Sequence, residues 1–85
     1  MREYACVLGI HVVESISRLP ARLREELLRA FDTITDRVHE PESSRFKDES
    51  GRWISEKTIG RWQIAYWVDG PVWEVRIVGV QRIRP

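Results

Sequence analysis

The chain has few of the side chains that build disulfide frameworks and metal sites. Its 85 residues include one cysteine, Cys6, and two histidines, His11 and His39. A single cysteine excludes an intramolecular disulfide, and these three residues together are too few for a standard zinc site. We therefore expect no metal and no cofactor, and the low cysteine content is typical of a protein of the reducing cytoplasm.

Long apolar runs are also missing from the sequence. The longest, residues 5–8 and 77–80, span only a few positions, whereas a transmembrane helix needs about 20 consecutive apolar residues. The apolar stretch after Arg2 and Glu3 is too short for a signal peptide. We expect no contact with a membrane, and the length limits the chain to one small domain, residues 1–85.

The net charge is only +1, but it is divided unevenly along the chain. Residues 1–43 hold six basic and eight acidic residues, a net charge of −2, and residues 44–85 hold eight and five, a net charge of +3. Twelve of the 14 basic residues are arginines, whose guanidinium groups suit bidentate phosphate contacts. Two interpretations stay open: a compositional preference for arginine, or a basic C-terminal half that meets nucleic acid or an acidic partner.

The N-terminal half has the pattern of one strand followed by two helices. Residues 3–8 are largely apolar and end at Gly9, which predicts a short strand. Apolar residues then recur every three positions over residues 10–19, and every three or four positions over residues 21–38, which predicts two amphipathic helices. Because Pro20 separates them and is tolerated at a helix start, the two helices should form a hairpin.

In the C-terminal half the period changes to two. Residues 42–51 are polar and predict a surface loop. Gly60 and the Asp-Gly-Pro sequence at residues 69–71 predict two chain reversals. They separate three runs that alternate or are rich in β-branched residues, which should form an antiparallel meander: residues 53–59, 62–68 and 72–80.

These elements predict an α+β fold in which the helical hairpin covers one face of a single sheet, since an apolar sheet face must be buried. The N-terminal strand should join this sheet, with Cys6 as a small buried residue of a central strand. In the second run of the meander, Ile64, Tyr66 and Val68 should face the helices. Trp67 should then lie on the opposite, uncovered face.

Three segments add a more specific signal: residues 15–20 (SISRLP) at the helix joint, residues 60–69 (GRWQIAYWVD), and residues 75–82 (VRIVGVQR) in the last strand. Together with the order of strand, two helices and meander, they make essentially the whole chain similar to the RelE/ParE superfamily of bacterial toxins. The resemblance implies a toxin of a type II toxin–antitoxin system, held inactive by a cognate antitoxin protein. RelE-type members are ribosome-dependent mRNA endoribonucleases that use no metal, and ParE-type members act on DNA gyrase.

The resemblance also assigns roles to single positions, with departures from the family pattern. The family's basic pair after the last strand corresponds to Arg82 and Arg84, and its arginine in the penultimate strand falls on Gln63. The family also carries lysines in the strand before the penultimate one, and the cation nearest to their positions in this chain is Lys57. The family's terminal tyrosine has no counterpart. Three functions stay open: a weakened mRNA endoribonuclease, a ParE-like inhibitor of a protein such as DNA gyrase, and a decayed toxin that only binds its antitoxin.

The candidate catalytic residues are Arg61, Arg82 and Arg84. They lie at the ends of the last two strands, which antiparallel pairing brings to the same end of the sheet. Guanidinium groups gathered there would stabilise negative charge on a phosphate without a metal. The alternative is a set of solvated charges that protect the end of a sheet from unwanted pairing.

The candidate RNA- or partner-binding residues are Lys57, Gln63 and Trp67. Lys57 lies on the strand next to the arginines, and Gln63 can donate hydrogen bonds. An exposed Trp67 beside arginines suits the stacking of a base, and it suits equally the packing of an antitoxin helix. We expect an antitoxin segment to dock as an amphipathic helix or as an added strand.

Overall fold

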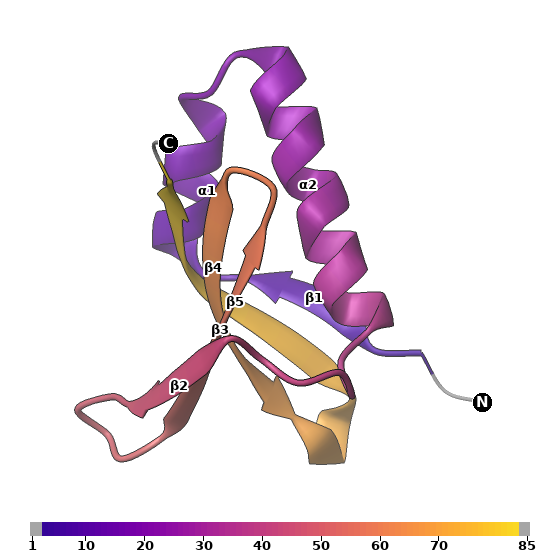
Figure 1. The fold of residues 1–85 in the computed structure, drawn as a ribbon, viewed down its shortest axis with the longest axis vertical. Coiled ribbons are helices and arrows are strands. Elements are labelled where there is room, and N and C mark those ends of the chain that lie inside the picture. Colours follow the sequence, from indigo (N-terminus) through magenta and orange to yellow (C-terminus); the bar gives the residue numbers. More distant parts are fainter. Residues whose placement is uncertain (1–2, 84–85) are drawn as a thin grey trace.

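The computed structural model describes residues 3–83, which form two α-helices and five strands (Figure 1). Along the chain the order is β1 (Ala5–Leu8), α1 (Ile10–Ser17), α2 (Ala21–Asp36), β2 (Ser44–Lys47), β3 (Trp53–Ile59), β4 (Trp62–Asp69), the short 3₁₀ helix η1 (Gly70–Val72) and β5 (Glu74–Arg82). The predicted strand, helical hairpin and meander are all present. The α+β fold class is therefore confirmed.

The strands form one mixed sheet in the order β1-β5-β4-β3-β2, so β4 is the central strand. β1 runs parallel to β5, and the other neighbouring pairs are antiparallel. A parallel pair needs a long crossover, and β1 reaches β5 only after the helical hairpin and the whole meander. In Figure 1 both helices lie together on one side of the sheet.

The core fills the space between the helices and one sheet face. Alternation along β4 points Trp62, Ile64 and Tyr66 toward the helices, and Val75 and Ile77 of β5 lie beside them. The helices contribute six buried residues to the same cluster: Val12, Ile16, Leu27, Ala30, Phe31 and Ile34. The predicted face of β4 is thus the buried one.

Tyr66 and Val68 share a strand face but differ in burial. Tyr66 is 2% exposed, and desolvation raises the pKa of its phenol, so it is a core residue as the sequence indicated. Val68 was expected beside it in the core, but its exposed fraction is 38% near the end of β4. The buried stripe of β4 therefore ends at Tyr66.

The structure corrects two other expectations. The segment 42–51 is not wholly a loop, because residues 44–47 form β2, which pairs with β3 and extends the meander to four strands. Cys6 lies on the edge strand β1, not on a central strand, and it is exposed. Although the residue as a whole is exposed, partial desolvation of its thiol raises the thiol pKa, which disfavours the nucleophilic thiolate.

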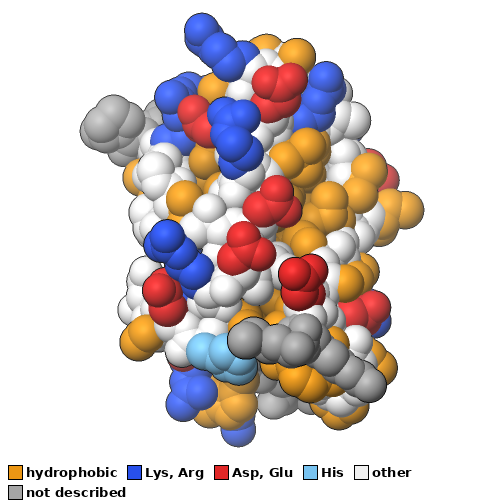
Figure 2. All heavy atoms as spheres, turned by 90° about the vertical axis from the view of Figure 1, so that its right-hand side faces the viewer, with side chains coloured by type: hydrophobic (Ala, Val, Ile, Leu, Met, Phe, Trp, Pro, Cys, Tyr) orange, Lys and Arg blue, Asp and Glu red, His pale blue; other side chains and the backbone are white. Residues whose placement is uncertain are grey.

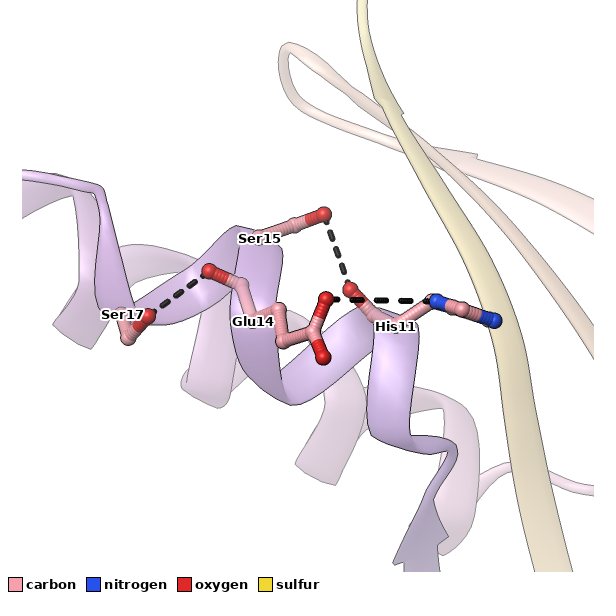
Figure 3. Close-up of polar contacts among 4 residues, drawn as sticks. All are labelled: His11, Glu14, Ser15 and Ser17. Atoms are coloured by element: carbon pink, nitrogen blue, oxygen red, sulfur yellow. Dashed lines mark hydrogen bonds and ion pairs between the residues drawn. The ribbon is translucent and has the colours of Figure 1, made fainter.

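The polar contacts of α1 are local to that helix (Figure 3). Ser15 Oγ donates to the carbonyl of His11 at 3.0 Å, and Ser17 Oγ donates to the carbonyl of Glu14 at 2.7 Å. His11 Nδ1 lies 4.0 Å from Glu14 Oε2, and the histidine side chain is 92% exposed. His11 is thus a surface residue, in agreement with its place outside every candidate site.

The surface around α2 carries both signs of charge, as Figure 2 shows. Basic side chains gather at the end where α2 begins, and acidic ones lie over its second half, beside a stripe of hydrophobic side chains. In the part of the chain that the structure describes, no helix is long and apolar enough to cross a membrane.

We predict that Ile77→Ala lowers the free energy of unfolding by about 2–5 kcal/mol, because it leaves a cavity at a side chain with 0% exposure. The matched control is Ile10→Ala, which removes the same atoms from a side chain with 70% exposure and should change stability by less than about 0.5 kcal/mol. Chemical denaturation of both variants measures the difference. Equal losses in the two variants would contradict the assigned core.

Candidate functional site

Two of the predicted arginines lie at the same end of the sheet. Arg61 occupies the turn between β3 and β4, and Arg82 ends β5, where it pairs with Trp62. The backbone N–H of Ile83 donates to the carbonyl of Arg61 at 2.7 Å, which fixes the two backbones side by side. Arg84 lies outside the described residues.

Arg61 is tied to α2 through Glu26. Its Nε lies 2.9 Å from Glu26 Oε2, and the same oxygen accepts a hydrogen bond from Trp62 Nε1 at 2.8 Å. The indole N–H of a buried tryptophan needs an acceptor. The Glu26 carboxylate therefore satisfies a hydrogen-bond donor of the core and also holds the arginine of the β3–β4 turn. Glu26 thereby neutralises part of the Arg61 charge, whereas Arg82 forms no ion pair within residues 3–83.

Lys57 points to a different part of the molecule. Its Nζ donates to the carbonyl of Arg37 at 3.3 Å, just after the end of α2. Arg37 and Glu26 are 11 positions apart, which corresponds to about 16 Å along a helix. Lys57 and Arg61 are therefore anchored at well-separated points, and the structure does not bring Lys57 into the arginine pair.

Gln63 lies on the uncovered face of β4, above a shallow hollow. The hollow has a volume of about 220 Å³, and its floor is formed by Ala65 and Gly79. These two are directly opposed, and a Cβ added at Gly79 would lie 3.6 Å from that of Ala65. Gln63 Nε2 lies at the rim, 3.5 Å from Glu56 Oε2, and faces Gln81 across the ladder. The hollow thus has an apolar floor and a rim of amide and carboxylate groups.

Trp67 lies on the same uncovered face, as the sequence predicted, and it is flanked by two arginines. The guanidinium carbon of Arg52 is 4.1 Å from the centre of the Trp67 ring, and that of Arg76 is 5.6 Å from it. Arg76 is in turn held by Glu74 at 2.6 Å and by Asp69 at 3.8 Å. Two guanidinium groups against one indole form a basic, aromatic platform.

Sequence reasoning missed both of these arginines. Arg76 pairs directly with Trp67 in the ladder, and counting residues back from the Asp-Gly-Pro turn could have found it. No pattern in the sequence indicates the contact of Arg52, because this residue reaches Trp67 only once the β2–β3 turn is folded. The open face therefore carries one arginine, Arg52, without an ion pair to a described residue, and a second, Arg76, that Glu74 and Asp69 hold.

The turn that positions Arg52 is organised by Asp48. Its Oδ1 accepts hydrogen bonds from the Ser50 hydroxyl at 2.6 Å, the Ser50 amide at 2.9 Å and the Arg52 amide at 3.0 Å. Gly51 supplies the positive φ of 83° that the turn requires. These bonds to the ionised form, with that from the Ser50 hydroxyl the strongest influence, hold the pKa of Asp48 below its usual value.

The site offers cations, hydrogen-bond donors and an aromatic ring. Within residues 3–83, no cluster of three or more His, Cys, Asp or Glu side chains could hold a metal ion. The proton-transfer candidates lie elsewhere: Tyr66 is in the core, His11 is on α1, and His39 contacts Tyr4 with ring centres 6.0 Å apart. The arrangement suits the binding of phosphate groups and bases better than it suits fast acid–base chemistry.

No protein-family model matches the chain, and no curated protein matches its sequence. Several solved structures do match. The RelE–RelB complex of the archaeon Pyrococcus horikoshii OT3 has 14% identity and a TM-score of 0.70, over 95% of this chain and 96% of that one. The toxin–antitoxin complex RelBE2 of Mycobacterium tuberculosis has 17% identity and a TM-score of 0.77, over 96% and 93% of the two chains.

The isolated RelE toxin of E. coli is similar as well, with 13% identity and a TM-score of 0.65, over 96% of this chain and 86% of that one. The similarity covers nearly the whole of each chain, so it concerns the complete arrangement of helices and strands. The chain therefore has the RelE fold, as its sequence pattern indicated.

We predict that loss of the Asp48 charge releases Arg52 from Trp67. A carboxylate with a lowered pKa in the folded state stabilises the turn above its unfolded pKa, and this contribution disappears as the pH falls through the folded-state value. The ¹⁵N-labelled indole signal of Trp67 should therefore move on acidification, and Asp48→Asn should produce the same change at neutral pH. Glu49→Gln is the matched control, and an unmoved signal in the Asp48 variant would refute the coupling.

Proposed function

We propose that this chain is the toxin component of a type II toxin–antitoxin system, with a weak, metal-independent and ribosome-dependent endoribonuclease activity toward mRNA in the cytoplasm. The observation that carries the proposal is the RelE fold with a basic, aromatic surface on the sheet face that the helices leave open. Arg82 pairs with Trp62 at the end of β5 and therefore projects from the side of the sheet that the helices cover, whereas the Trp67 platform lies on the open side.

The charges support binding of an RNA backbone. Arg52 lies against Trp67 and forms no ion pair with a described residue, so it could meet the phosphate of a base stacked there, whereas Arg76 is held by Glu74 and Asp69 and contributes less. Arg82 forms no ion pair with a described residue, and its guanidinium group is able to stabilise the charge that grows on a phosphate during attack by a 2′-hydroxyl. Arg61 contributes less, because Glu26 holds it.

The same residues predict slow cleavage. General acid–base groups typically contribute a factor of about 100 to 10,000, and no histidine, tyrosine or lysine side chain among residues 3–83 forms a hydrogen bond or a ring contact with Arg82. Gln63 supplies hydrogen bonds but no charge where the resembled family has an arginine. Charge stabilisation without efficient proton transfer should give a weakened ribonuclease.

A second candidate function follows from the positions at which this chain departs from the residue pattern of RelE-type toxins. The Arg61–Glu26 ion pair and the neutral Gln63 favour a non-catalytic module that binds a protein target such as DNA gyrase, or that binds only its antitoxin. In that case the Trp67 platform is a protein-docking surface, for which tryptophan and arginine are the preferred anchors.

The partner in either case is a cognate antitoxin. Two of the similar structures are complexes of a RelE-type chain with its RelB-type partner. This chain has two edge strands, β1 and β2, and an open face with half-buried aromatic surface. An added strand or an amphipathic helix would cover such surfaces. Expression should therefore arrest growth, and co-expression of the protein encoded by the neighbouring gene should relieve the arrest.

We predict that the double change Arg61→Ala and Arg82→Ala abolishes growth arrest and lowers cleavage of ribosome-bound mRNA by about 100-fold or more. The fold should persist, because Glu26 still accepts the Trp62 hydrogen bond and exposed charges contribute little to stability. Arg22→Ala with Arg29→Ala removes the same charge from α2 and serves as the control. Growth arrest by the folded Arg61/Arg82 variant would exclude these residues from the activity.

We predict that Gln63→Arg raises mRNA cleavage at least about tenfold if the chain is a weakened ribonuclease, because it adds a cation at the rim of the hollow. Gln81→Arg places the same charge on the opposing strand and tests whether the position matters. Mapping of mRNA 5′ ends in translating extracts measures both variants. Arrest with no fragments in any variant would favour the protein-target alternative.

A further inference from the structure

The β2–β3 hairpin carries a second aromatic and basic surface. In the ladder Lys47 lies directly opposite Trp53, and Arg45 lies opposite Ser55, so Arg45, Lys47 and Trp53 project from one face. The guanidinium carbon of Arg45 is 4.7 Å from the centre of the Trp53 ring, and Lys47 Nζ is 5.1 Å from it. We term these three residues the outer hairpin surface.

The outer hairpin surface lies on the other side of the sheet from Trp67. Ser55 shares the face of Trp53 and pairs with Tyr66, which is buried beneath the helices. Trp67 follows Tyr66 in β4 and therefore points the opposite way. The helices do not reach this part of the hairpin: Trp53 is 50% exposed, and Figure 1 shows β2 and the start of β3 projecting away from α1 and α2.

The charge of this surface is positive and largely uncompensated. Among the described residues Lys47 forms no ion pair, and Arg45 meets one carboxylate, that of Glu42, at 3.9 Å between partly exposed side chains. A contact of this kind is weak in water. In the adjacent turn, Asp48 accepts the hydrogen bonds of that turn, and among the described residues neither Asp48 nor Glu49 forms an ion pair with Arg45 or Lys47. Both cations are thus free to meet phosphate groups.

Trp53 has no role in the core. It is absent from the buried cluster, and half of its surface is open to water. Cations alone would suffice to protect the edge strand β2 from unwanted pairing, and a cation–π contact at an exposed site stabilises a fold only slightly. A half-exposed indole with two cations over its ring instead combines the two groups that single-strand-binding surfaces use, an aromatic ring for a base and cations for the adjoining phosphates.

We infer that the outer hairpin surface binds single-stranded RNA, with a base stacked on Trp53 and phosphates held by Arg45 and Lys47. The preference for RNA over other nucleic acids rests on the proposed function. A purely acidic peptide, without apolar or aromatic side chains, would satisfy the two cations but would leave the indole without a partner. Because Trp53 and Trp67 face opposite ways, the hairpin holds a stretch of RNA different from the one at the open sheet face.

The test is binding of a fluorescein-labelled 12-nucleotide single-stranded RNA to the purified full chain, followed by anisotropy over a series of salt concentrations. Trp53→Ala should weaken binding by about 5- to 100-fold, and Trp53→Phe, which keeps a stacking ring, should retain most of the affinity. Arg45→Ala with Lys47→Ala should reduce the slope of log K against log salt by about 1.4, since each phosphate contact on a single strand contributes about 0.7.

Arg22→Ala with Arg29→Ala is the matched control, because it removes two positive charges from α2 and should leave the slope unchanged. Circular dichroism confirms that each variant is folded, and the Arg45/Lys47 variant alters only exposed side chains. Wild-type affinity in both the Trp53→Ala and the Arg45/Lys47 variants would overturn the inference. So would binding of a labelled oligoglutamate peptide that depends on Trp53 while RNA binding does not.

Failure of this inference is distinguishable from failure of the proposed function. If the chain arrests growth but the hairpin variants bind RNA normally, the toxin assignment stands and the outer hairpin surface has no part in RNA binding. If Trp53 is required for RNA binding but expression leaves growth unaffected, the hairpin surface stands and the toxin assignment fails.

Discussion

The alternation of side chains along β4 is the constraint on which the rest of the structure depends. Every second residue from Trp62 to Tyr66 is buried beneath the helices, and the residues between them face away. As the central strand, β4 thereby supplies the middle of the core and the middle of the open face at once. Moving its register by one residue would expose the core side chains and bury Gln63 and Trp67 together.

Glu26 connects stability with the candidate chemistry. The Trp62 indole is 3% exposed and needs an acceptor for its N–H, which Glu26 supplies from α2. The same carboxylate oxygen holds Arg61 at 2.9 Å and lowers the positive potential at the end of the sheet. A requirement of the core therefore weakens one member of the arginine pair, while Arg82, opposite Trp62 on the next strand, forms no ion pair with any of residues 3–83.

The elements that the sequence predicted well are those with a strong local pattern. The two helices show an apolar stripe and a proline joint, and β4 shows strict alternation, so Tyr66 and Trp67 could be assigned to the correct faces. β2 could not be found, because all four of its residues are exposed and it is defined only by its pairing with β3. Edge strands of this kind have no burial signal.

The candidate site was predictable only in part for a related reason. The juxtaposition of Arg61 and Arg82 follows from antiparallel pairing, which sequence order alone determines. The direction of Lys57 and the contact of Arg52 with Trp67 depend on where α2 ends and how the β2–β3 turn closes. The position of Cys6 depends on strand order, which places β1 at the edge of the sheet.

The β2–β3 hairpin, of which the sequence pattern missed β2, explains why both faces of this end of the molecule carry an arginine against a tryptophan. Phe46 and Ile54 oppose each other on the face of Trp67, where Ile54 is buried, so that face of the hairpin is anchored to the sheet. With that face fixed, alternation forces Arg45, Lys47 and Trp53 to the other side, beyond the cover of the helices. One turn, held by Asp48, thus positions Arg52 against Trp67 on one face while its strands present a separate aromatic and basic surface on the other.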